Sequence, residues 1–91
     1  MIIFNILYNY ILMYQFKVST RKNKKYDVYK DNKYLVSFGD KNYQQFIDST
    51  PIKYYSALNH YDEKRRQNYY KRFGSNAKFE SAMYFSHKYL W

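Results

Sequence analysis

Apolar and polar residues alternate along three segments in the first half of the chain. Within residues 14–20, every second position from Tyr14 to Val18 carries an aromatic or branched apolar side chain, a spacing that predicts a β-strand with one buried face. Residues 26–29 and 34–38 are also interpreted as strands, and the polar run 21–25 separates the first two. Asp31-Asn32 suits a tight hairpin, because both residue types tolerate positive φ. The pattern predicts a three-stranded antiparallel meander.

The second half of the chain changes to a helical spacing. Asp40 can cap a helix that runs to about Ile47. Thr50 followed by Pro51 is a stronger signal, because a hydroxyl caps the first turn and proline suits the first helical position; this helix would end near His60. With two later helices, the chain is predicted to be α+β: a three-stranded antiparallel meander followed by three or four short helices.

The best-marked helix runs from Asp62 to Phe73. Its acidic residues lie at the positive end of the helix dipole and its last basic residues at the negative end. Gly74 follows, where a residue with positive φ commonly ends a helix. Ser81 can cap a further short helix in the tail. Because residues 79–91 are apolar on nearly all sides, we expect them to pack against the domain.

Trp91 is the only tryptophan, and a chain with few aliphatic residues needs large rings in its core. We expect its ring to be mostly buried against the sheet or the 62–73 helix, with its carboxylate near a cation. The candidate cations are Arg65, Arg66 and Lys88. An alternative is that the tail docks on a partner, as in a structural or adaptor protein such as a minor virion component. The partner-docking residues would then be Tyr84, Phe85, Tyr89 and Trp91.

Residues 1–14 are apolar except for Asn5 and Asn9. This run is shorter than the roughly 20 residues that a membrane span needs, and it lacks the basic start and the cleavage site of a secretory signal. We therefore predict no transmembrane segment, an apolar extension over 1–13, and a single domain over 14–91. It stays open whether Met1 or Met13 is the true start, and whether the extension packs on the domain or binds a partner.

The chain offers little for catalysis. Among its 91 residues there is no cysteine and no glycine-rich phosphate loop, and no serine lies in a Gly-x-Ser-x-Gly turn. The two histidines are far apart, and His60 with Asp62 and Glu63 does not match a metal-ligand spacing. We therefore predict no enzyme, no catalytic or metal-ligating residue, no cofactor and no small-molecule substrate.

The net charge of +9 has two explanations. Such an excess attracts polyanions such as nucleic acid. The abundant residues Lys, Asn, Tyr, Phe and Ile also have codons rich in A and T, so genome composition alone could produce a basic, tyrosine-rich chain. Arginine codons need more G or C, so an AT-rich genome does not favour arginine. The arginines of the 62–73 helix are therefore more informative than the lysines.

Two basic patches are candidate nucleic-acid-binding sites. On the 62–73 helix, Arg65 is expected to lie on aromatic rings, since guanidinium planes stack well on them, while its neighbours face outward. A solvated surface is the alternative for both patches. The candidate phosphate-binding residues are Lys64, Arg66, Lys71 and Arg72 on the helix, and Lys22, Lys24 and Lys25 at the tip of the first hairpin.

Three segments within about residues 25–91 carry a resemblance. They are Ser37-Phe38-Gly39-Asp40, then Asp62-Glu63-Lys64-Arg65-Arg66 continuing through Tyr69 to Lys71-Arg72, and Phe85-Ser86 followed by Tyr89-Leu90-Trp91. Together they resemble a family of small uncharacterised proteins encoded by giant double-stranded DNA viruses. In that family a histidine follows the last arginine, where this chain has Phe73, so any role of that histidine would not carry over.

The resemblance implies an origin and not a mechanism, because the family has no established activity. It implies a virus with an AT-rich genome, and a protein found in the infected-cell cytoplasm, the virus factory or the virion. The function we predict is a non-enzymatic module that binds a polyanion, most plausibly nucleic acid. A viral or host protein partner is the alternative.

Overall fold

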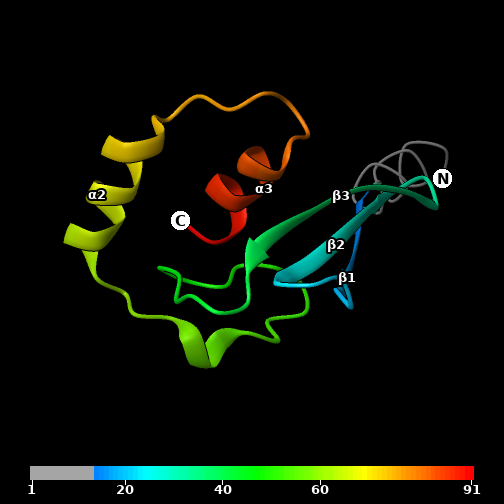
Figure 1. The fold of residues 1–91 in the computed structure, drawn as a ribbon, viewed down its shortest axis with the longest axis horizontal. Coiled ribbons are helices and arrows are strands. Elements are labelled where there is room, and N and C mark those ends of the chain that lie inside the picture. The colour runs from blue at the N-terminus through cyan, green and yellow to red at the C-terminus, as the bar shows by residue number, and fades with distance from the viewer. Residues whose placement is uncertain (1–13) are drawn as a thin grey trace, which may run out of the picture.

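The computed structural model describes residues 14–91, so the predicted extension over 1–13 lies outside the described residues. It shows an antiparallel sheet of strand order β1-β2-β3, followed by a 3-10 turn and two α-helices (Figure 1). The α+β meander with short helices is therefore confirmed. The elements are β1 (Tyr14–Val18), β2 (Lys24–Lys30), β3 (Lys33–Asp40), η1 (Ser56–Leu58), α2 (Glu63–Phe73) and α3 (Ala82–Tyr89).

The second hairpin turns at the predicted dipeptide. Asp31 and Asn32 have φ angles of 51° and 66°, and two successive positive values define the turn type whose twist matches that of paired strands. Lys30 and Lys33 pair directly across it. The short polar side chains thus set the register of β2 against β3.

One face of the sheet carries the hydrophobic core. Two cross-strand rows run over it, Phe16 beside Val28 and Val36, and Val18 beside Tyr26 and Phe38. Helix α3 lies along β3 (Figure 1) and covers these rows with its own aromatic residues. The residues of this core that are buried almost completely are Tyr26, Val28, Phe38, Phe85 and Leu90.

The helix predicted over 40–47 is absent. Asp40 accepts a hydrogen bond from the amide of Asn42 at 2.9 Å, but the chain then becomes extended and pairs with the tail. The amide of Ile47 donates to the carbonyl of Leu90 at 3.2 Å, and that of Ser49 to Tyr89 at 2.8 Å. These long-range hydrogen bonds satisfy backbone groups that a helix would have satisfied locally.

The helix predicted from Thr50 to His60 is also absent, apart from the single 3-10 turn η1. The cause is the buried carboxylate of Asp48, which accepts hydrogen bonds from the hydroxyls of Tyr26 and Thr50 and from the amide of Tyr55. Thr50 does accept from the amide of Lys53 at 3.1 Å, but Lys53 then adopts a φ of 55°. The predicted cap therefore closes one turn and no helix.

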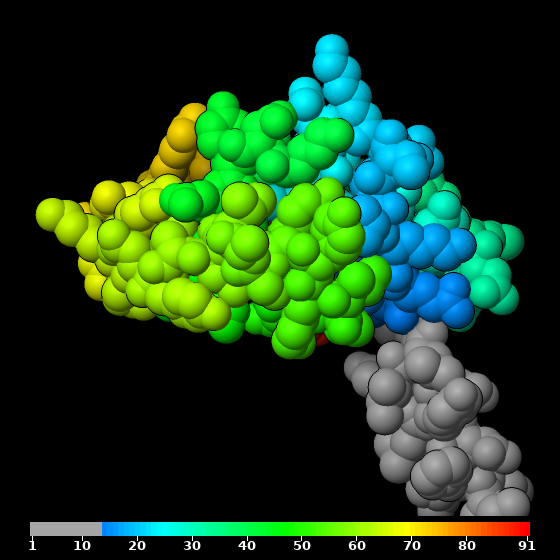
Figure 2. Space-filling view, turned by 90° about the horizontal axis from the view of Figure 1, so that it is seen from below, coloured from blue at the N-terminus to red at the C-terminus, as the bar shows by residue number. Residues whose placement is uncertain are grey.

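Segment 41–61 forms much of one face of the molecule. In the space-filling view of Figure 2 it is the green surface between the blue residues of β1 and the yellow-green residues of α2. Because this segment is held by Asp48 and by backbone bonds to the tail, it links the sheet to the helical part of the domain.

Both α-helices begin at the predicted caps. The Asp62 side chain accepts from the amide of Arg65 at 3.1 Å, and Ser81 accepts from Tyr84 at 3.2 Å. Gly74 ends α2 with a φ of 75°. Neither helix in residues 14–91 has the length and apolarity that crossing a membrane requires.

Candidate nucleic-acid interface

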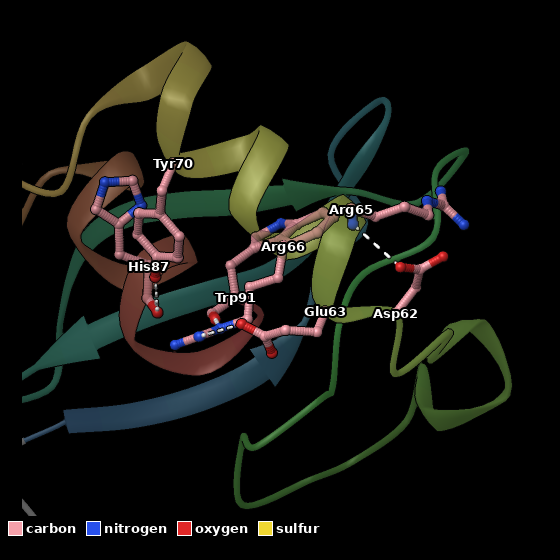
Figure 3. Close-up of polar contacts among 7 residues, drawn as sticks. All are labelled: Asp62, Glu63, Arg65, Arg66, Tyr70, His87 and Trp91. Atoms are coloured by element: carbon pink, nitrogen blue, oxygen red, sulfur yellow. Dashed lines mark hydrogen bonds and ion pairs between the residues drawn. The ribbon is translucent and has the colours of Figure 1, made fainter.

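Adjacent arginines of α2 point in opposite directions. Figure 3 shows the Arg66 side chain turned toward Trp91 and Glu63, whereas that of Arg65 turns away from them. Arg66, Tyr69 and Tyr70 are the partly buried residues of the helix, at the spacing of one helical face. This face packs against the tail, and the rest of α2 is exposed.

Arg66, which the sequence analysis placed among the phosphate-binding residues, makes several contacts within the fold, and 39% of its side chain is exposed. Its Nε donates to the backbone oxygen of Trp91 at 2.5 Å, and its Nη1 lies 3.2 Å from Glu63 Oε1. Its guanidinium also lies 5.4 Å from the ring centroids of both Phe46 and Tyr70. The expected contact between Trp91 and an arginine of this helix is present, and Arg66 supplies it.

The Trp91 ring completes this packing. It is partly buried and stacks on Tyr69, with the ring centroids 4.4 Å apart and the planes 7° from parallel. Tyr69 in turn contacts the ring of His87, and its hydroxyl lies 2.8 Å from His87 Nδ1. Burial lowers the pKa of His87 and raises the pKa of Tyr69 to about 12, so both groups are neutral at pH 7.

Lys25 is buried, which contradicts its assignment to an exposed hairpin tip. Only 2% of it is exposed, and its ammonium donates to the carbonyl of Tyr43 and to the side-chain oxygen of Gln45. Burial lowers the pKa of Lys25 to about 8. A group that is held in this way anchors the loop after β3 and is not free to bind a phosphate.

The other two hairpin lysines line a groove of about 1050 Å³ together with residues of α2. Lys22 comes from the β1–β2 turn and Lys24 is the first residue of β2, whereas Arg65 and Arg72 come from α2. All four are exposed. We call this hollow the basic groove. Phe38, Leu90, Tyr69 and Trp91 also line it, and Asp40 is the acidic residue among the lining residues.

The structure thus brings parts of the two predicted patches together at one groove. Arg72, Lys22 and Lys24 line the basic groove as predicted candidates, while Lys64 and Lys71 are exposed on α2 but do not line it. Sequence reasoning missed Arg65, which it assigned to ring stacking. The available signal was spacing, because Arg65, Asn68 and Arg72 follow the i, i+3, i+7 pattern of one helix face.

The tail forms part of the fold, and one of its proposed docking residues is unavailable. Phe85 has no exposed surface and packs its ring on Phe38 at 5.8 Å between centroids, so its assignment to partner docking is corrected. Tyr84, Tyr89 and Trp91 are partly buried and pack against the same core. Docking through these four side chains as a group would require the core to open.

Residues 14–91 contain no group of three or more His, Cys, Asp or Glu side chains that could hold a metal ion. Comparison with protein-family models, with curated proteins and with solved structures gives no match. The resemblance to proteins of giant viruses therefore stays a prediction.

Proposed function

We propose that this protein is a non-enzymatic nucleic-acid-binding module whose basic groove holds the phosphates of the ligand. The observation that carries the proposal is the convergence of four exposed cations from two distant segments on one groove. An AT-rich genome could enrich lysine along the whole chain, but it gives no reason for these four cations to gather at one groove. Two of the four are arginines, whose planar donors suit phosphate oxygens.

The pattern of ion pairs supports the same conclusion. In the part of the chain that the structure describes, the ion pairs involve Arg21, Lys30 and Arg66. Lys22, Lys24, Arg65 and Arg72 take part in none of them. Arg65 donates one hydrogen bond to the side chain of Gln44 at 2.8 Å, which leaves its charge uncompensated. The basic groove therefore has the charge to replace condensed counterions on a phosphate chain.

The resemblance supports a viral setting for this activity. In that setting, the ligand would be nucleic acid that is being replicated or packaged. Neither role requires catalysis by the protein, which fits a chain without a recognisable catalytic constellation.

The test is the salt dependence of binding to a short oligonucleotide and to a duplex of equal length. Replacing Lys22, Lys24, Arg65 and Arg72 with Gln removes four groove cations. Each phosphate contact contributes about 0.7 to the slope of log K against log salt for single strands and about 0.9 for duplex DNA. We expect the slope to fall by roughly three to four, with the fold intact.

A matched variant replaces four exposed lysines that lie outside the basic groove, and so changes the total charge equally. We expect its slope to change by less than one. An equal fall in both variants would show diffuse attraction and refute the groove, and absence of binding at low salt would refute the proposal altogether. The control positions are Lys33, Lys64, Lys71 and Lys78.

A further inference from the structure

Two aromatic side chains in the basic groove are exposed. Tyr43 is 69% exposed and Phe73 is 40% exposed, and both line the groove beside the cations. Other rings of the domain are exposed as well, namely Tyr34, Tyr54, Tyr61 and Phe79. None of these lines the groove, so Tyr43 and Phe73 are the exposed rings that lie among its cations. Exposed apolar side chains in a charged hollow are typical of a site for a ligand with both charged and flat apolar parts.

We infer that the basic groove binds a single strand of DNA or RNA, with unpaired bases stacked on Tyr43 and Phe73. This inference rests on the proposed function and specifies its ligand. A duplex offers phosphates and base edges, but its base faces are stacked inside. A single strand offers phosphates and base faces together, and stacking on aromatic residues is how many proteins bind it without reading sequence.

The Tyr43 ring is carried on a backbone that is held in place. The amide of Tyr43 donates to the carbonyl of Asp40 at 3.1 Å, and its carbonyl accepts from buried Lys25 at 2.9 Å. This arrangement gives the buried lysine a function, because it fixes the loop that presents the ring. A backbone already held in position loses less conformational entropy on binding.

The Phe73 ring extends a packed aromatic group. Its centroid lies 5.0 Å from that of Tyr69, which stacks on Trp91. The guanidinium of Arg72 lies 5.0 Å from the Phe73 ring centroid. Arg72 thus lies over the exposed Phe73 ring, so a cation and an aromatic side chain adjoin at the end of α2, as one nucleotide requires.

The test compares Tyr43→Leu and Phe73→Leu with the matched variant Tyr54→Leu, since Tyr54 is 65% exposed but does not line the groove. The probes are an oligo(dT) strand and a duplex of equal length. Each groove variant should bind the strand about 5- to 150-fold more weakly, the fold-change of one lost base stack. Its salt slope and its duplex affinity should not change. Tyr54→Leu should bind both as the unchanged protein does.

Equal affinity for strand and duplex, with no effect of Tyr43→Leu, would overturn the stacking inference while leaving phosphate binding in place. Absence of binding to either probe would refute the proposed function itself. Photo-cross-linking of a strand containing bromodeoxyuridine provides a second measurement that does not depend on any variant. Cross-links should fall in the tryptic peptides 42–53 and 73–78, and cross-links confined to other peptides would also overturn the inference.

Discussion

Arg65 and Arg66 are neighbours in one helix, and the structure predicts opposite consequences when each is changed to Gln. Arg66→Gln removes a charged hydrogen bond to the backbone of Trp91, worth about 1.5–3 kcal/mol. It also removes cation–π contacts with Phe46 and Tyr70, worth about 0.5–1 kcal/mol each. The exposed pair with Glu63 adds little. We expect a loss of about 2.5–5 kcal/mol in the free energy of unfolding.

Arg65→Gln removes one exposed hydrogen bond to Gln44, so its expected loss is about 0.5 kcal/mol. The assay is thermal unfolding followed by circular dichroism. A change of 1 kcal/mol shifts the melting temperature of a domain of this size by roughly 4–8 °C. Arg66→Gln should therefore lower the melting temperature by about 10 °C or more, and Arg65→Gln by only a few degrees.

The same two variants should behave in the reverse order in a binding assay below both melting temperatures. Arg65→Gln should flatten the salt slope for a single strand by about 0.7, while Arg66→Gln should leave it unchanged. Equal destabilisation by the two variants would refute the structural assignment of Arg66. If Arg66→Gln flattened the salt slope and Arg65→Gln left it unchanged, the prediction from sequence would hold, with Arg66 as the phosphate-binding residue and Arg65 as the residue that stacks on rings.

Further predictions concern the core and the buried titratable groups. Phe85→Ala should cost about 3–5 kcal/mol of stability in urea unfolding, because it empties the centre of the core; a loss below 1 kcal/mol would contradict this packing. Burial lowers the pKa values of His60 and His87, so the unfolded chain binds more protons below about pH 6.5. The free energy of unfolding should therefore fall as the pH drops from 7 to 5. It should fall less steeply in a variant in which both histidines are replaced by Gln. The pKa of Lys25 is about 8, below its ordinary 10.5, so between these values the unfolded chain again binds more protons. Stability should rise by roughly 1–2 kcal/mol from pH 8 to 9.5, and Lys25→Met should abolish that rise.

Local patterns in the sequence were sufficient for the elements whose signals are local. Alternation predicted the strands, Asp31-Asn32 the hairpin, and Asp62 and Ser81 the helix starts, because each depends on neighbours in sequence. The helices predicted after Asp40 and Thr50 were wrong because residues far along the chain compete for the same backbone groups. Tertiary contacts of this kind override local propensity and leave no periodic signal.

The site was harder to predict than the fold. Composition indicated basic patches, but side-chain type alone does not distinguish a solvated cation from one held inside the structure. Lys25 is buried because the loop after β3 folds over it and offers two oxygen acceptors. Arg66 is engaged because Trp91 returns to α2 at the end of the chain. Only the folded chain brings Lys22 and Arg65 to one groove.

The most direct test of the central claim is an NMR titration of the isotopically labelled protein with oligo(dT) at low salt. Signals of Lys22, Lys24, Arg65 and Arg72 should shift together, in a saturable way and at the same strand concentration, because one strand would contact both sides of the basic groove. Shifts confined to the outer face of α2 around Lys71, or the absence of saturable shifts, would contradict the account.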